Sequence, residues 1–311
     1  MLGLLSGLYL GWGVGANDAA NTFGPQVGAG VVEFRTATIL AAVFAFVGAI
    51  VEGPKVFPVL GGLTQLTLAM SVIAALAAGV TVNVLTAFGL PISTSHAIVG
   101  ALAAMGLMER AGFNATILVK LGVAFVTAPV GAAVIANLLY RLVARTGAGR
   151  LGGIIFYPGV VRATGIAVGC YAAYALGSNN VGNAMAPFVA VGLVGPRLGA
   201  ALGGAAIAAG VLTFSYRVIM LVGKQITALG PISALVASAA TAITTHLFTQ
   251  LGVPVSTSQA IVGAVIGVGL TKGLTAVDRR TVWMIPAGWV ISIAGSAVVA
   301  SVLMAGYAAL R

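Results

Sequence analysis

Hydrophobic positions occur along the chain in long uncharged runs that short polar connections separate. Residues 56–108 contain no charged side chain, and the stretches between Arg162 and Arg197 and between Lys224 and Lys272 contain none either. A helix needs about 20 mostly apolar residues to cross roughly 30 Å of hydrocarbon. These runs therefore predict a series of membrane-spanning helices.

Each half of the chain divides into five apolar segments. The first five cover roughly residues 1–30, 36–53, 62–88, 89–108 and 113–140, and their counterparts begin near residues 163, 198, 225, 252 and 281. We expect an all-α polytopic membrane protein, with residues 1–145 as a first repeat, residues 146–162 as a short linker and residues 163–311 as a second repeat. Residues 1–32 carry no cation, so we interpret them as a retained helix and not as a cleaved signal peptide.

The composition excludes an ordinary water-soluble domain. Only 6% of the residues are charged, where soluble proteins have roughly 25%, and the mean hydropathy is +1.12. The net charge of +10 comes from cations scattered at the ends of apolar runs, so it predicts contact with the lipid bilayer and not with nucleic acid. Cys170 is the only cysteine, which excludes an intrachain disulfide.

Two motifs occur twice, in the same order. Residues 89–100 and 252–263 share nine of twelve positions at a spacing of 163 residues, and Gly15–Asn21 matches Gly177–Asn183 at a spacing of 162. The two halves are therefore a duplicated unit. An odd number of segments in each half predicts that the second copy is inverted relative to the first, an arrangement common in carriers that work by alternating access. A scaffold without a transport role and a channel are the alternatives.

The distribution of arginines predicts the orientation. The connection between the halves, residues 141–162, contains four arginines and no acid, and cytoplasmic loops carry such an excess of cations. We expect residues 141–162 to be cytoplasmic and both termini to lie outside the cell. The expected location is the cytoplasmic membrane.

The Ser-Thr-Ser motifs predict an anion site. Glycine and proline interrupt the preceding helix in both copies, and serine or threonine is well suited to cap the next one. A helix that begins inside the membrane directs free N–H groups and a partial positive charge into its surroundings. The candidate oxyanion ligands are Ser93, Thr94, Ser95, Ser256, Thr257 and Ser258. Hydrogen bonding between helices is the alternative role for these hydroxyls.

The asparagine-rich motifs predict a cation site beside it. Asp18 is the only acid in residues 1–32, and a carboxylate inside a membrane needs a partner. Asn17, Asn179 and Asn180 add carboxamide oxygens, which suit Na⁺, while a proton site is the competing interpretation. Since Asn180 replaces the acid in the second copy, that copy cannot carry a proton.

Two histidines and a few other polar side chains lie outside the candidate ligand sets. His96 follows the first Ser-Thr-Ser motif and is an accessory donor candidate, as is Gln259 in the second copy. We expect His246 to pack between helices with a bond to a carbonyl group. Glu52 and Lys55 fit charged groups at the membrane interface.

The motifs Gly15–Asn21, Pro91–His96 and residues 222–231, with the second copies of the first two, resemble the inorganic phosphate transporter family, the Pit-type phosphate permeases and sodium–phosphate symporters. The resemblance spans the whole chain. It implies uptake of inorganic phosphate coupled to Na⁺ or H⁺, with the anion held by the Ser-Thr residues and by asparagine side chains such as Asn21 and Asn183. The family usually has Asp in place of Asn180, His in place of Gln259, and a longer central linker.

We therefore expect a secondary symporter of inorganic phosphate, driven by Na⁺, in which two inverted halves rock around a central site. Sulfate or another oxyanion as the substrate, and H⁺ as the coupling ion, are the alternatives. The motifs contain one acid and one histidine and no cluster of metal ligands, so we expect no enzymatic activity and no cofactor. A homodimer is a further expectation.

Overall fold

The computed structural model describes residues 2–88, 92–147, 157–220, 230–272 and 279–310. The first half contains α1 (Leu4–Asp18), α2 (Ala20–Gly28), α3 (Phe34–Glu52), η1 (Gly53–Val56), α4 (Phe57–Gly61), α5 (Leu68–Ala87), α6 (Thr94–Met108) and α7 (Ala115–Gly147). The second contains α9 (Pro158–Ala190), α10 (Pro196–Phe214), α12 (Pro231–Gln250), α13 (Thr257–Lys272) and α14 (Arg279–Ala309).

Some sequence-based expectations fall outside this part of the chain. Pro91, most of the linker at residues 146–162, and residues 222–229 of the third motif are among them. So is most of the connection between α13 and α14.

The predicted class of an all-α membrane protein is confirmed. In the described ranges, seven segments are long and apolar enough to cross a membrane: Phe34–Gly61, Leu68–Ala87, Ala115–Arg145, Pro158–Ala190, Pro196–Phe214, Pro231–Gln250 and Gly288–Ala309. The first apolar segment is divided at Ala19 into α1 and α2. The helices that follow the Ser-Thr-Ser motifs, α6 and α13, are short, with 15 and 16 residues.

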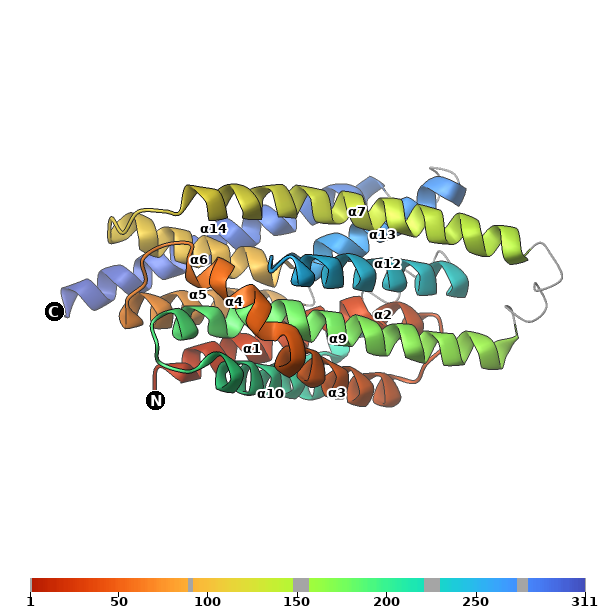
Figure 1. The fold of residues 1–311 in the computed structure, drawn as a ribbon, viewed down its shortest axis with the longest axis horizontal. Helices are drawn as coiled ribbons and strands as arrows, with labels where there is room; N and C mark the ends of the chain where they lie inside the picture. The colour runs from red at the N-terminus through yellow and green to blue at the C-terminus, as the bar shows by residue number, and fades with distance from the viewer. Residues whose placement is uncertain (1, 89–91, 148–156, 221–229, 273–278, 311) are drawn as a thin grey trace.

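These two short helices are the returning arms of hairpins. In Figure 1, α5 runs from the end of the molecule that carries both termini toward its middle, and α6 returns to the same end. Helices α12 and α13 do the same from the opposite end. At the base of the first hairpin, the Asn114 N–H donates to the Leu63 carbonyl at 3.0 Å, and Thr64 Oγ1 donates to the Gly112 carbonyl at 2.7 Å. The predicted broken helices at both motifs are thus hairpins, in which the described residues that lead into α6 and α13, 92–95 and 253–258, are buried.

Equivalent helices of the two halves run in opposite directions. Helix α1 starts at the end with the N-terminus, whereas α9 starts at the other end, where α7 finishes (Figure 1). The last described helix, α14, returns to the end where the chain began. An inverted duplication requires such opposite directions, and both termini lie at the same end of the molecule.

The two sequence halves interlock. Helix α1 packs on α10 and α3 on α9, while α6 packs on α14 and α7 on α13, so each pair joins the two halves. Glycine allows two of these approaches, because an added Cβ would overlap the backbone of Ile207 at Gly15 and that of Ala45 at Gly177. Two further contacts link these pairs, because α9 also packs on α12 and α1 also packs on α5.

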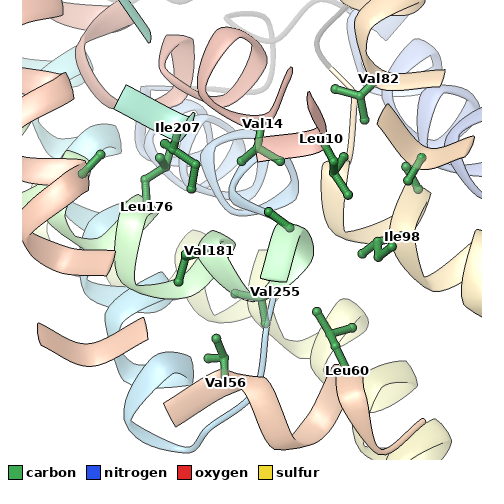
Figure 2. Close-up of a cluster of buried hydrophobic side chains, with 14 of the residues drawn as sticks. Leu10, Val14, Val56, Leu60, Val82, Ile98, Leu176, Val181, Ile207 and Val255 are labelled. Atoms are coloured by element: carbon green, nitrogen blue, oxygen red, sulfur yellow. The ribbon is translucent and has the colours of Figure 1, made fainter. Parts of the chain in front are cut away.

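The hydrophobic core also draws on both halves. Figure 2 shows Val14 of α1 on the side of Ile207 of α10, and Val56 of η1 near Val181 of α9. Val255 lies in the same cluster, directly before the second Ser-Thr-Ser motif. The hydrophobic core is therefore shared by the two sequence halves. The rocking of the two halves around a central site stays a prediction.

The turns that follow α2 and α9 have the same conformation. Gly30 and Gly192 both have positive φ, +69° and +72°. This conformation is accessible to glycine at little cost, and it allows the chain to reverse after a helix. The Val31 N–H then donates to the Gln26 carbonyl at 2.9 Å, and the Leu193 N–H donates to the Phe188 carbonyl at 3.0 Å.

Candidate functional site

The Ser-Thr-Ser motifs cap the helices that follow them, as predicted. Ser93 Oγ accepts from the His96 N–H, and Ser256 Oγ accepts from the Gln259 N–H, each at 3.2 Å. Helices α6 and α13 therefore begin inside the protein, and their first N–H groups have no partner within their own helix. Two helix N-termini with their partial positive charge are thus placed at the tips of the two hairpins.

Two asparagines hold the extended segments that lead into these helices. Asn17 donates to Thr86 Oγ1 at 2.9 Å and accepts from the Ile92 N–H at 3.3 Å. In the second copy, Asn179 donates to Thr249 Oγ1 at 2.9 Å and accepts from the Val255 N–H at 2.8 Å.

Both asparagines therefore fasten a hairpin tip with their carboxamides, which favours a positioning role over cation binding. The two threonines, Thr86 and Thr249, were missed in the sequence. Their matching spacing of 163 residues could have indicated them.

The two hairpin tips are hydrogen-bonded to each other and to the opposite asparagine motif. Ser95 Oγ donates to the Val255 carbonyl at 3.0 Å, and Ser258 Oγ donates to the Ile92 carbonyl at 2.8 Å. Asn21 of α2 donates to Ser258 Oγ at 3.0 Å. Asn183 of α9 donates to Ser95 Oγ, also at 3.0 Å. Each asparagine motif thus contacts the Ser-Thr-Ser motif of the other half.

Asp18 lies at the centre of this arrangement and is 1% exposed. Its Oδ2 accepts from Thr94 Oγ1 at 2.7 Å and from Asn180 Nδ2 at 2.9 Å. Its Oδ1 has longer contacts with Ser258 Oγ and Asn21 Nδ2, both at 3.4 Å, and Thr257 also hydrogen-bonds this carboxylate. The carboxylate is therefore well solvated by protein donors on one oxygen and weakly on the other.

Several oxygens beside Asp18 could ligate a cation. Asn180 Oδ1 and Asn183 Oδ1 are buried and have no hydrogen-bond partner among the described residues. Pro25 and Pro187 follow Asn21 and Asn183 by four positions, and proline has no N–H, so the main-chain carbonyls of both asparagines lack their helical donor. Carboxylate and carbonyl oxygens are the ligands that hard cations prefer.

All predicted ligands of the anion and the cation are enclosed by the protein. The residues Asn17, Asp18, Asn21, Ser93, Thr94, Ser95, Asn179, Asn180, Asn183, Ser256, Thr257 and Ser258 are each at most 5% exposed. The hydroxyl, amide and carboxylate groups thus meet in a part of the molecule that is shielded from both membrane surfaces. Interactions between charges are strong in such surroundings.

The accessory candidates, His96 and Gln259, lie at the edge of this group. The His96 ring contacts the rings of Phe125 at 4.2 Å and Trp289 at 6.4 Å between centroids, on α7 and α14. Its Nδ1 and the Gln259 Oε1 are buried and have no partner in the described part of the chain. Neither side chain has a described hydrogen bond to the residues around Asp18.

A second polar group surrounds Glu52, at the end of α3. Lys55 Nζ lies 3.1 Å from Glu52 Oε1 and donates to Gln250 Oε1 at 2.7 Å, and Gln250 Nε2 donates to Glu52 Oε1 at 2.9 Å. His246 Nε2 lies 2.9 Å from Glu52 Oε2, and its Nδ1 lies 2.8 Å from the Tyr171 hydroxyl. The expected bond from His246 to a carbonyl is therefore wrong. A carboxylate 194 positions earlier in the chain is its partner, which α3 and α12 bring together.

Comparison with known proteins agrees with this architecture. A model of the "Phosphate transporter family" matches residues 14–156 and 156–300. "Putative phosphate permease PF1020" of Pyrococcus furiosus is 27% identical, over 97% of this chain and 95% of its own length. "Inorganic phosphate transporter 2-1, chloroplastic" of Arabidopsis thaliana is also 27% identical, over 93% of this chain and 69% of its own.

A solved structure has the same fold. "The sodium-dependent phosphate transporter" superposes with a TM-score of 0.90 and 24% sequence identity, over 99% of this chain and 98% of that one. At this identity the match establishes the shared architecture of the two chains. The matched proteins are permeases and transporters, not enzymes.

Proposed function

Since the chain belongs to the phosphate transporter family, we propose that it is a secondary symporter that moves inorganic phosphate with Na⁺ across the cytoplasmic membrane. The observation that carries this proposal is the meeting of two capped helix N-termini with a buried carboxylate. Ser95 and Ser258 bond across the two hairpin tips, and Asp18 lies beside them. Such N-termini bind oxyanions, and such a carboxylate binds cations.

The phosphate ligands in this proposal are neutral donors. Thr94, Ser95, Thr257 and Ser258 supply hydroxyls, and the first N–H groups of α6 and α13 supply main-chain donors. Asn21 and Asn183 supply amide hydrogens. Ser93 and Ser256 are N-caps in this arrangement, so they orient the helix ends toward the anion. Donors without charge leave the compensation of the phosphate charge to a cation that binds with it.

Coupling follows from the proximity of two negative charges. A phosphate held by Thr94 and Ser258 lies next to Asp18, because both hydroxyls also contact that carboxylate. The two anions repel strongly away from water, and a Na⁺ beside Asp18 removes that repulsion. Each ligand therefore raises the affinity for the other by the same factor. Asn180 Oδ1 and Asn183 Oδ1 complete the cation ligands in this proposal.

Transport requires that the site open to each side in turn. The group of α1, α3, α9 and α10 and the group of hairpins with α7 and α14 are the candidate moving bodies. Their boundary runs through Asp18 and the hairpin tips, so a relative displacement opens the site at one end or the other. The cytoplasmic position of residues 141–162 and the external position of both termini belong to the same proposal.

Uptake into proteoliposomes tests the function. Labelled phosphate is supplied with an inward Na⁺ gradient, with an inward H⁺ gradient, or with neither, and excess sulfate is added as a competitor. We expect accumulation only with the Na⁺ gradient and little inhibition by sulfate. Accumulation driven by the H⁺ gradient would instead establish H⁺ coupling, and inhibition by equimolar sulfate would establish a broader oxyanion permease. Passive flux without accumulation would contradict symport.

A further inference from the structure

The two copies of the asparagine motif differ at the position that bears the charge. Asp18 in α1 and Asn180 in α9 are equivalent at the spacing of 162 residues, and 1% and 0% of their surfaces are exposed. They contact each other directly, since Asn180 Nδ2 donates to Asp18 Oδ2 at 2.9 Å. One carboxylate and one neutral amide thus face each other at the centre of the site.

The amide N–H of Asn180 stabilises Asp18 Oδ2. If residue 180 were an aspartate, a cation between the two carboxylates would have to stabilise this oxygen instead. Two acids this close inside the membrane would repel each other unless positive charge lay between them. Here the N–H group supplies that stabilisation permanently, as part of the chain. The contact therefore contains one negative charge instead of two, and needs no second cation.

The remaining features point to a single cation at the other carboxylate oxygen. The contacts of Asp18 Oδ1 with Asn21 and Ser258 are long, at 3.4 Å each, so they stabilise this oxygen less than the shorter bonds stabilise Oδ2. Asn180 Oδ1 and Asn183 Oδ1 are fully buried and unpartnered in the described ranges, as expected of oxygens that a cation contacts in another step of the cycle. Among the described residues around Asp18 no second carboxylate is present to hold a second cation.

We infer that this transporter binds one Na⁺ with each phosphate, and that Asn180 takes the place of a second cation. The inference rests on the proposed function for the role of Na⁺ in coupling. It assigns Asn180 a specificity role, because this residue sets the number of ions that accompany the substrate.

Na⁺-dependent stability measures the ion count without any transport. Thermal unfolding of the purified protein is followed in detergent without phosphate, while choline replaces Na⁺ at constant ionic strength. An ion that binds only the folded state stabilises it in proportion to the logarithm of its concentration, with one increment for each ion bound. We expect the slope of melting temperature against log Na⁺ to double in Asn180→Asp, and to keep the wild-type value in Glu52→Gln, which changes a charge outside the site. Asp18→Asn should abolish the slope.

Uptake measurements give a second, independent count of the Na⁺ ions carried with each phosphate. For the wild type we expect a Hill coefficient for Na⁺ of about 1, rising toward about 2 in Asn180→Asp. At zero membrane potential and equal pH, a tenfold Na⁺ gradient should support about tenfold accumulation of phosphate. A hundredfold accumulation by the wild type would overturn the inference, and so would an unchanged Na⁺ slope in Asn180→Asp.

The two failures can be told apart. If the wild type carries no phosphate, the proposed function is wrong, but the stability slopes still count the ions. If Asn180→Asp does not fold even in high Na⁺, the accumulation ratio of the wild type decides the count alone.

Discussion

Two groups of side chains flank the site at equivalent positions of the duplicated chain, and they differ in polarity. On one flank Glu52, Lys55, His246 and Gln250 form a charged network against Tyr171. On the other flank their counterparts are Phe214, Arg217, Asn83 and Ala87, and Tyr9 takes the place of Tyr171. There the Phe214 ring stacks on Trp12 at 5.1 Å, and Trp12 stacks on Tyr9 at 6.3 Å.

The centre of the site behaves differently, because its contacts are the same in both copies. Asn17 and Asn179 hold the hairpin tips alike, and Asn21 and Asn183 reach across to the opposite tip alike. The difference teaches that equivalent flanks can be joined by different chemistry, a charged network between α3 and α12 in one copy and stacked rings between α1 and α10 in the other. The centre must keep its shape, apart from the exchange of Asp18 for Asn180.

The largest effect is expected at the one position where the centre is not symmetric. Asp18→Asn removes the one carboxylate among the described residues of the site and, with it, the repulsion that in our proposal couples Na⁺ to phosphate. Na⁺-driven uptake in proteoliposomes should fall by about 10- to 100-fold, the usual size of a coupling effect, while the protein still inserts into the membrane. Full Na⁺-dependent uptake by this variant would contradict the assignment of Asp18.

The next largest effect is expected where helices from different halves approach each other closely. Gly15→Ala and Gly177→Ala each add a Cβ that overlaps the backbone of the neighbouring helix. Both substitutions should lower the free energy of unfolding by about 1–3 kcal/mol or more, as overpacking does, and the melting temperature in detergent measures this. Gly122→Ala is the matched control, since its added Cβ would meet no atom within 4 Å. If the melting temperatures of Gly15→Ala and Gly177→Ala differ markedly, the packing of α1 on α10 is not equivalent to the packing of α9 on α3.

The symmetric asparagines should give smaller, equal effects. Asn17→Ala and Asn179→Ala leave the N–H groups of Ile92 and Val255 without their acceptor. Each variant should lose about 1–3 kcal/mol, the cost of an unpaired buried donor. Hydrogen exchange should become faster at Ile92 in one variant and at Val255 in the other. If phosphate binding is lost while exchange at these amides is unchanged, the asparagines are ligands and not positioning residues.

The flanks should be the least sensitive. Glu52→Gln removes a partly exposed charge whose loss should cost at most about 1 kcal/mol. Phe214→Leu loses the ring stack on Trp12, which contributes about 0.5–1.5 kcal/mol. Uptake should stay within a factor of two or so of the wild type in both variants, as expected of such small energies. Loss of uptake in Glu52→Gln alone would make the charged flank part of the transport mechanism.

The sequence alone predicted the all-α membrane fold and singled out the two pairs of repeated motifs, but not Thr86, Thr249 or the break at Ala19. Runs without charge predict membrane helices because lipid leaves few alternatives for an apolar chain. Gly, Pro and Ser at residues 252–256 predict the break before α13 because each has a strong local preference. The repeat spacing paired Asp18 with Asn180, and the distribution of arginines predicted the orientation. These inferences depend on local chemistry or on the order of motifs.

Only the tertiary structure decided which residues meet. Asn21 bonds to Ser258 and Asn183 to Ser95, across more than 80 positions of sequence, because helices of the two halves interlock. The same packing gave Asn17 its positioning role and brought His246 to Glu52. Contacts of this kind depend on helix directions and close approaches in three dimensions, on which the periodicity of a single segment carries no information.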